Sequence, residues 1–164
     1  MMLCTALLLT AAHSAQAQIA KSNVQPPETT SAPAADKADQ FKALDTRLQQ
    51  TFQRMFEGAE VTDINTGAHN TNISFNKAGE RYLALFTNRG TWLQTIHYYD
   101  ARKLAPAIRT LVEDAYPEYS LLRVAEVNIG GKIAHIVDIE THRRFKKVRV
   151  FEGEVDVYQA FDKQ

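Results

Sequence analysis

Residues 81–100, RYLALFTNRGTWLQTIHYYD, constrain the fold of this chain more than any other stretch. β-Branched and aromatic residues lie on both sides of the dipeptide Arg89-Gly90, which predicts two long strands joined by a tight turn. A similar pattern returns in residues 144–162, RFKKVRVFEGEVDVYQAFD, when Gly153 is aligned with Gly90. The recurrence predicts that the fold contains a duplicated unit.

The N-terminal part of the chain has the composition of a targeting segment followed by a linker. Residues 1–17 contain an apolar run that is too short to span a bilayer and end in the A-x-A tripeptide AQA, which predicts a secretory signal peptide. Residues 18–39 are rich in Pro, Ala, Ser and Thr, and we expect them to be a disordered linker. Residues 40–164 are enough for one domain with its own core.

Charge and cysteine content exclude several classes of function. The 164 residues include 19 Lys and Arg and 19 Asp and Glu, so the chain has no net charge to attract nucleic acid or an anionic membrane. Cys4 is the single cysteine and lies within the predicted signal peptide, which leaves the mature chain without disulfides or thiol chemistry. We expect a periplasmic or secreted protein with no nucleic-acid partner and no stable membrane insertion.

Helical spacing of apolar residues occurs twice. Residues 38–57 predict one helix with an apolar stripe made of Phe41, Leu44, Leu48, Phe52 and Met55. Residues 105–116 predict a second helix, in which Pro106 suits the first turn and Pro117 ends the helix.

Each predicted helix is followed by four predicted strands. The first four cover residues 60–65, 71–77 and the two arms of 81–100; the second four cover residues 121–129, 132–141, 144–151 and 155–161. Short connections make each group an antiparallel meander. The predicted fold class is therefore α+β. Two α-ββββ repeats, residues 40–100 and 101–164, form an antiparallel sheet of about eight strands with the helices on one face.

Four short motifs, in this order and spacing, resemble those of a known family. They are MFEGAEV at residues 55–61, FTNRGTWL at 86–93, LAPAI at 104–108 and AYPEY at 115–119. The family is that of the PepSY-like, β-lactamase-inhibitor-like domains of exported Bacteroidetes proteins. The resemblance implies an exported, non-catalytic domain, and most members of this family have no assigned function.

The resemblance covers residues 40–162 and departs from the family pattern at two places. Glu57 stands where the family usually has proline, and Thr87 stands where it has an acidic residue.

Catalytic and metal-binding patterns are not found in the sequence. The histidines outside the signal peptide never fall in HxH or HExxH spacing; they are His69, His97, His135 and His142. We therefore predict no catalytic residues, no metal and no cofactor.

A basic run covers residues 142–149, HRRFKKVR. Two interpretations are possible. The run is either a site for an acidic partner or anionic surface, or the solvated side of an amphipathic strand. On the second reading, Asp156 lies opposite Arg149 across a turn at Glu152-Gly153.

The hairpin at residues 81–100 carries large apolar groups on both faces, so one set has to be covered or exposed. The family pattern predicts that Phe86 and Leu93 are buried and that Trp92, Ile96 and Tyr98 are exposed. The repeat alignment predicts instead that Trp92, Leu83 and Leu85 are buried. The residues that it leaves exposed are Tyr82, Phe86, His97 and Tyr99.

The exposed set is the candidate binding surface. The function predicted is an exported, non-catalytic protein-binding module, with inhibition as one form of it, which holds an envelope or secreted protein on an open aromatic sheet face. The candidate protein-binding residues are Trp92, Tyr98, Ile96, Tyr82, Phe86 and Tyr99. The alternative is a structural or self-associating cell-envelope protein that forms a homodimer without a separate partner.

Overall fold

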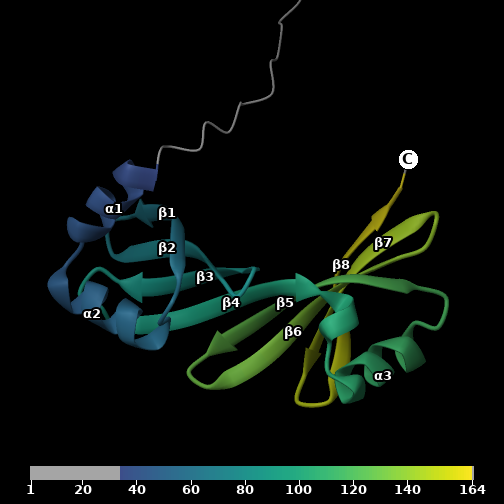
Figure 1. Ribbon diagram of the computed structural model, residues 1–164. Coiled ribbons are helices and arrows are strands. Elements are labelled where there is room, and N and C mark those ends of the chain that lie inside the picture. The colour runs from purple at the N-terminus through teal and green to yellow at the C-terminus, as the bar shows by residue number, and fades with distance from the viewer. Residues whose placement is uncertain (1–33, 164) are drawn as a thin grey trace, which may run out of the picture. The chain divides into compact units, whose positions relative to one another are not determined.

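The structure is a computed structural model that describes residues 34–163 (Figure 1). The predicted signal peptide, residues 1–17, and most of the predicted linker lie outside the described residues. The described part has an α+β fold with three α-helices, one short 3₁₀ helix and eight strands.

The first predicted helix is wrong in its bounds, because two helices stand in its place. They are α1, Ala34–Lys42, and α2, Thr46–Met55. Asp45 separates them as the N-cap of α2, and its side chain accepts a hydrogen bond from the backbone N–H of Arg47. The apolar stripe predicted one continuous helix, but the cap at Asp45 begins a second helix within it.

Helix α1 also corrects the predicted extent of the linker, because residues 34–39 are helical. Phe41 packs against the ring of Phe52 with the ring centroids 5.4 Å apart, and Lys37 Nζ lies 3.0 Å from Asp63 Oδ1 on the first strand. These contacts hold α1 against the sheet.

The second predicted helix is confirmed as α3, Pro106–Ala115, with Pro106 in its first turn. The 3₁₀ helix η1, Ala101–Lys103, leads into it and was not predicted.

The eight strands form one antiparallel sheet, which confirms the predicted sheet. They are β1 Glu60–Thr66, β2 Asn70–Lys77, β3 Glu80–Thr87, β4 Trp92–Asp100, β5 Ser120–Ile129, β6 Lys132–Glu140, β7 Arg144–Phe151 and β8 Glu154–Asp162. Their order in the sheet is their order in the sequence, so each strand is hydrogen-bonded to its neighbours along the chain.

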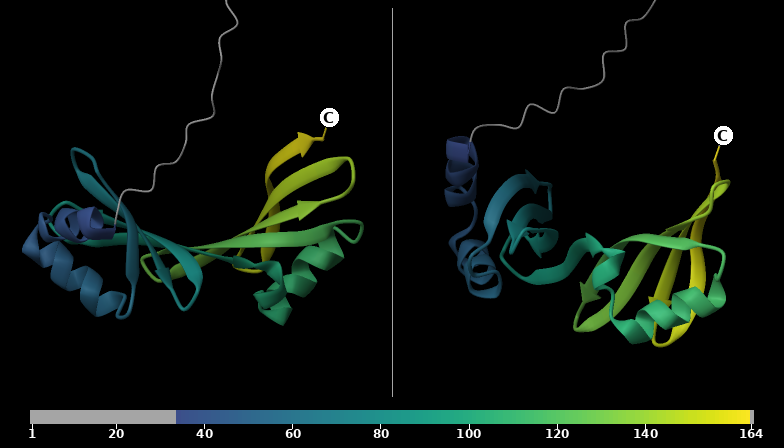
Figure 2. Two further views of the ribbon diagram at one scale, coloured as in Figure 1. Left: turned by 45° about the horizontal axis from the view of Figure 1, so that its top comes forward. Right: turned by 45° about the vertical axis from the view of Figure 1, so that its right-hand side comes forward.

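Both helix-packed cores lie on the same face of the sheet. α2 packs Leu48 and Phe52 against β2 and β3, in a first core cluster completed by Ile73, Phe75, Ala84 and Phe86. α3 packs Val112 against the strands of the other half, in a second core cluster completed by Ala101, Leu104, Val124, Val137, Ile139, Val148 and Val150. Figure 2 shows α3 lying against the β5–β8 half.

The register of the strands shows why the two clusters share a face. Residues paired across neighbouring strands point to the same side, and one line of such pairs crosses the sheet through Tyr82, His97, Glu126, His135 and Val150. This line begins at a residue that packs on the first core cluster and ends at a residue of the second. We call this side the helix face and the other side the open face.

The β3–β4 hairpin follows the predicted pairing except at its tip. Tyr82 pairs with His97, as predicted, but a bulge makes Phe86 pair with Trp92 instead of Leu93. The loop is longer than two residues, because the backbone N–H of Thr87 donates to the carbonyl of Thr91 over 2.8 Å. The register shift brings Trp92 against the first core cluster.

A candidate binding pocket on the open face

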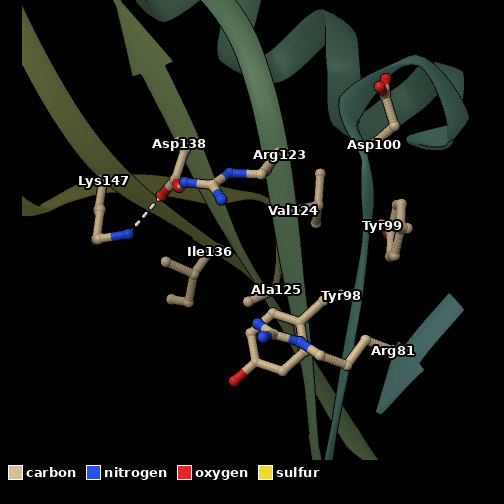
Figure 3. A pocket seen from close by; sticks show the side chains of 10 residues that line it. All are labelled: Arg81, Tyr98, Tyr99, Asp100, Arg123, Val124, Ala125, Ile136, Asp138 and Lys147. Carbon is tan, nitrogen blue, oxygen red and sulfur yellow. Dashed lines mark hydrogen bonds and ion pairs between the residues drawn. The ribbon is translucent and has the colours of Figure 1, made fainter. Parts of the chain in front are cut away.

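A pocket of about 530 Å³ lies in the middle of the sheet and is lined mainly from the open face (Figure 3). It lies over two neighbouring rows of paired residues that cross strands β3 to β7. The first row is Arg81, Tyr98, Ala125, Ile136 and Arg149, and the second row is Asp100, Arg123, Asp138 and Lys147. Paired side chains in an antiparallel sheet are close neighbours, so residues far apart in sequence meet here.

The hollow in this pocket is explained by one small side chain. Ala125 lies between Tyr98 and Ile136 in the first row, and all three side chains line the pocket. The methyl group of Ala125 leaves space between two larger neighbours that stand on either side of it. The floor of the pocket is therefore apolar.

Arg81 forms one wall of the pocket by stacking on Tyr98, with its guanidinium carbon 4.3 Å from the centre of the ring. Figure 3 shows the guanidinium lying over the ring. Within residues 34–163, no carboxylate forms an ion pair with Arg81. Its positive charge is thus not neutralised by the described part of the chain.

Asp138 lies on the opposite side of the pocket and is shared by two cations. Its side chain accepts a hydrogen bond from Lys147 Nζ over 2.6 Å and lies 3.5 Å from Arg123 Nη2. Asp138 is only 7% exposed, whereas the Arg123 side chain is 76% exposed. One buried carboxylate therefore contacts two cations and compensates the charge of only one of them, while the Arg123 side chain remains largely in contact with solvent.

The second carboxylate beside the pocket is engaged by an arginine outside it. Asp100 Oδ1 lies 2.9 Å from Arg102 Nε, and Asp100 Oδ2 lies 3.0 Å from Arg102 Nη2. These hydrogen bonds, with one from the backbone N–H of Arg102, lower the pKa of Asp100 to about 2. The pocket therefore keeps an excess of positive charge from Arg81, Arg123 and Lys147.

Two of the six predicted binding residues lie on the open face. Tyr98 lines the pocket, and Ile96 lies in the next row, paired with Leu83 and Val127. This is the arrangement that the family pattern predicted for these two residues.

The other four predicted residues lie on the helix face. Phe86 is completely buried in the first core cluster, so its predicted exposure in the repeat alignment is wrong. Trp92 packs on the same cluster and its Nε1 donates to Thr95 Oγ1 over 2.9 Å, because the hairpin bulge turns it away from the open face. Tyr82 packs on the first cluster; Tyr99 packs on the second cluster and also lines the pocket.

Tyr82 and Tyr99 belong to a polar group between the two core clusters. Tyr82 stacks on His97 with centroids 4.1 Å apart, and His97 Nε2 lies 2.6 Å from Glu80 Oε2. The Tyr99 hydroxyl donates to Glu126 over 3.2 Å. Burial raises the pKa of Tyr82 and Tyr99 above the ordinary tyrosine value. Both side chains thus contribute to the packing of the helix face, and Tyr99 in addition borders the pocket.

The sequence analysis named three of the residues that line the pocket, which are Tyr98, Tyr99 and Lys147 of the basic run. The pairing of Arg149 with Asp156 is confirmed, with Arg149 Nη2 2.5 Å from Asp156 Oδ2. Arg81, Arg123 and Asp138 were missed, because each has the appearance of an ordinary surface charge in the sequence of its own strand. The signal that could have found them is the alternation of side chains between the two faces of each strand, combined with the pairing register between strands. Together these place the charges next to one another on one face of the sheet.

Among residues 34–163, no group of three or more His, Cys, Asp or Glu side chains could hold a metal ion. None of the helices in this range is long and apolar enough to cross a membrane.

Comparison with known proteins identifies the fold. No protein-family model matches the chain, and no curated protein matches its sequence. A DUF2874 family protein from Bacteroides ovatus is 15% identical with a TM-score of 0.59, over 73% of this chain and 87% of that one. A BLIP-like protein from Bacteroides fragilis is 14% identical with a TM-score of 0.59, over 73% and 86%.

A third protein, from Bacteroides eggerthii, is provisionally assigned to the periplasm. It is 12% identical with a TM-score of 0.59, over 73% of this chain and 88% of that one. At these identities the likeness is one of fold, and the fold is that of the BLIP-like and DUF2874 proteins.

Proposed function

We propose that this protein is an exported, non-catalytic binding module that holds another protein on the open face of its sheet. The observation that carries the proposal is an apolar surface around the pocket that no helix within residues 34–163 covers. It is made of Leu83, Leu85, Ile96, Tyr98, Val127 and Ile136. These side chains are only partly buried, and both helix-packed cores lie on the other face. An apolar sheet surface of this kind is suited to contact with a protein partner.

Export and a non-catalytic role are parts of the same proposal. Export is supported by the sequence of residues 1–17 and by the provisional periplasmic assignment of one structural neighbour. A non-catalytic role is supported by the likeness to BLIP-like and DUF2874 folds, and inhibition of a partner enzyme is one form that the binding can take. The two-repeat origin of the fold also stays a proposal, supported by the recurrence of helix followed by four strands.

Site-specific photo-crosslinking in the source cells tests the binding role. A photoreactive phenylalanine analogue is placed at Ile96, on the open face, and in a control chain at Gln50, which is exposed on α2. We expect one reproducible protein adduct from position 96, none of that mass from position 50, and loss of the adduct when Tyr98→Ser is added.

The controls separate binding from folding. Tyr98→Ser should keep the thermal unfolding transition close to that of the parent chain, because Tyr98 lies outside both core clusters. Equal adducts from both positions, or an adduct that survives Tyr98→Ser, would contradict the proposal.

Self-association is the second candidate function, and the free edge of β8 favours it. In the part of the chain that the structure describes, this strand pairs with β7 alone, and it exposes 49% of Val157, 62% of Tyr158 and 52% of Phe161. An edge strand with apolar side chains can pair with the same strand of a second copy. Sedimentation velocity over a wide concentration range should show a dimer that Tyr158→Lys disperses, whereas a monomer at every concentration would exclude this function.

A further inference from the structure

We propose that the open-face pocket seats the carboxylate of a single glutamate or aspartate that projects from a loop of the protein partner. This inference rests on the proposed function and specifies the chemistry of the partner. Four observations carry it: the charge balance of the pocket, the geometry of Arg81, the apolar floor, and the neutrality of the whole chain.

The charge balance favours an anionic occupant. Arg81, Arg123 and Lys147 line the pocket, and they face a single internal counter-charge, Asp138, since Asp100 is held by Arg102. A bound carboxylate would supply the missing negative charge between Arg81 and Arg123. A cationic or neutral polar group would leave the excess charge uncompensated.

The stacking of Arg81 leaves its hydrogen-bond donors available. A guanidinium that lies flat on an aromatic ring, as Arg81 does on Tyr98, uses its face for the ring and keeps its N–H groups at its edge. Those N–H groups form a planar fork that matches the two oxygens of a carboxylate. The ring also fixes the fork in place, so less side-chain freedom is lost on binding.

The apolar floor fits the stem of an acidic side chain. Ala125 and Ile136 lie beneath the charged walls, and the ring of Tyr98 forms one side. The methylene groups of glutamate would rest on this floor while its carboxylate reaches the guanidinium groups. A protein side chain combines an apolar stem with one charge in the way that this pocket requires.

A polyanionic partner fits the same surface poorly. The chain has 19 positive and 19 negative side chains, so it has no overall attraction to nucleic acid or to an anionic membrane. Asp138 and Asp156 also lie on the open face beside the cations, where they would repel a row of phosphates. These carboxylates restrict the favourable position to a single acidic group.

Nuclear magnetic resonance titration tests the inference with small probes that need no identified partner. The probes are N-acetyl-glutamate N-methylamide and the matching glutamine compound, each added to the isotope-labelled chain. We expect the glutamate probe to shift the backbone signals of Tyr98, Ala125 and Ile136 and the side-chain N–H signal of Arg81. Its affinity should exceed that of the glutamine probe by about tenfold or more, since only it forms charge-assisted hydrogen bonds.

Matched variants test whether the pocket is responsible. Arg81→Gln should reduce the affinity for the glutamate probe by about tenfold, and Ala125→Leu should abolish binding by filling the hollow. Arg54→Gln removes an equal charge from the exposed side of α2 and should change nothing. Because Arg81 is exposed and lies outside both core clusters, Arg81→Gln should unfold close to the temperature of the parent chain.

Several results would overturn the inference. Equal shifts with both probes, shifts that map outside the pocket, or full affinity in Arg81→Gln would each show that the pocket does not select a carboxylate. Co-sedimentation with phosphatidylglycerol vesicles that Arg81→Gln abolishes would assign the surface to a membrane instead. A crosslinked partner at position 96 without glutamate selectivity would leave the proposed function in place and refute only this inference; selectivity without a crosslinked partner would refute the proposed function.

Discussion

Replacing Gly90 with alanine should destabilise the fold far more than the same change at an equivalent hairpin turn. Gly90 lies at the tip of the β3–β4 hairpin with φ at +88°, and it is buried against the first turn of α2. A Cβ atom there would lie 2.6 Å from the backbone nitrogen of Leu48 and 2.8 Å from the carbonyl carbon of Arg47. Both are backbone atoms, so α2 or the hairpin would have to move.

The expected magnitude has two parts. A positive φ in a residue other than glycine costs about 1–2 kcal/mol, and forcing extra volume into a packed contact costs about 1–3 kcal/mol more. A small gain of about 0.4–1 kcal/mol offsets part of this, because alanine restricts the unfolded chain. We therefore expect Gly90→Ala to lower the free energy of unfolding by about 2–4 kcal/mol.

Gly153 provides the matched control. It lies at the tip of the β7–β8 hairpin with φ at +85°, and a Cβ atom there would meet nothing within 4 Å. Gly153→Ala should therefore show the backbone cost alone, about 1 kcal/mol after the unfolded-state offset. Urea unfolding followed by circular dichroism gives both values, provided that the slopes with denaturant are equal.

Equal losses in the two variants would refute this reasoning. If Gly90→Ala and Gly153→Ala differed by less than about 0.5 kcal/mol, the close approach of the hairpin to α2 would not restrict position 90. The crowding of Gly90 by Leu48 would then relax at no measurable energetic cost.

Three further predictions concern the helix face. A hydrogen bond from Lys103 and a smaller effect of the neighbouring histidine lower the pKa of Glu80 below its ordinary value of 4.5. Its stabilising effect is therefore present above that pH and is lost as the pH falls through the lowered pKa, so the loss of unfolding free energy in Glu80→Gln should be constant near neutrality and should shrink in acid. Phe52→Ala should lower the free energy of unfolding by about 3–5 kcal/mol, because Phe52 is 3% exposed in the first core cluster; Met55→Ala, at a residue 39% exposed, should change it by about 1 kcal/mol or less, and denaturant unfolding measures both. Trp92, the single tryptophan, packs on that cluster, so its fluorescence should be blue-shifted and protected from acrylamide, and a red-shifted, freely quenched signal would contradict its position.

The sheet could be predicted from the sequence because its signals are local. Alternating residues and glycine turns define each strand, and sequential pairing follows from the short connections. Two departures come from local features that compete with the periodic pattern, one a capping side chain and the other a loop length. Asp45 caps a new helix inside a continuous apolar stripe, and the longer loop after Thr87 moves Trp92 to the other face.

The pocket could not be predicted in the same way, because it depends on register across five strands. Arg81, Arg123 and Asp138 each look like an ordinary surface charge in their own strand. They come together because β4 and β5, which are separated by α3, pair in a register that brings Tyr98 opposite Ala125. A shift of that register by one residue would replace Ala125 with a neighbour that points to the helix face.

The sequential order of the strands has a consequence for how the chain folds. Seven of the eight strands can pair with the strand just before them in the sequence through a short hairpin or, for β5, across α3. Low separation between partners favours rapid folding, because little loop entropy is lost before each pairing forms. When the chain is synthesised from its N-terminus, the partner of each new strand has already been made. The sheet can therefore grow one strand at a time from β1, and it is complete when β8 is added.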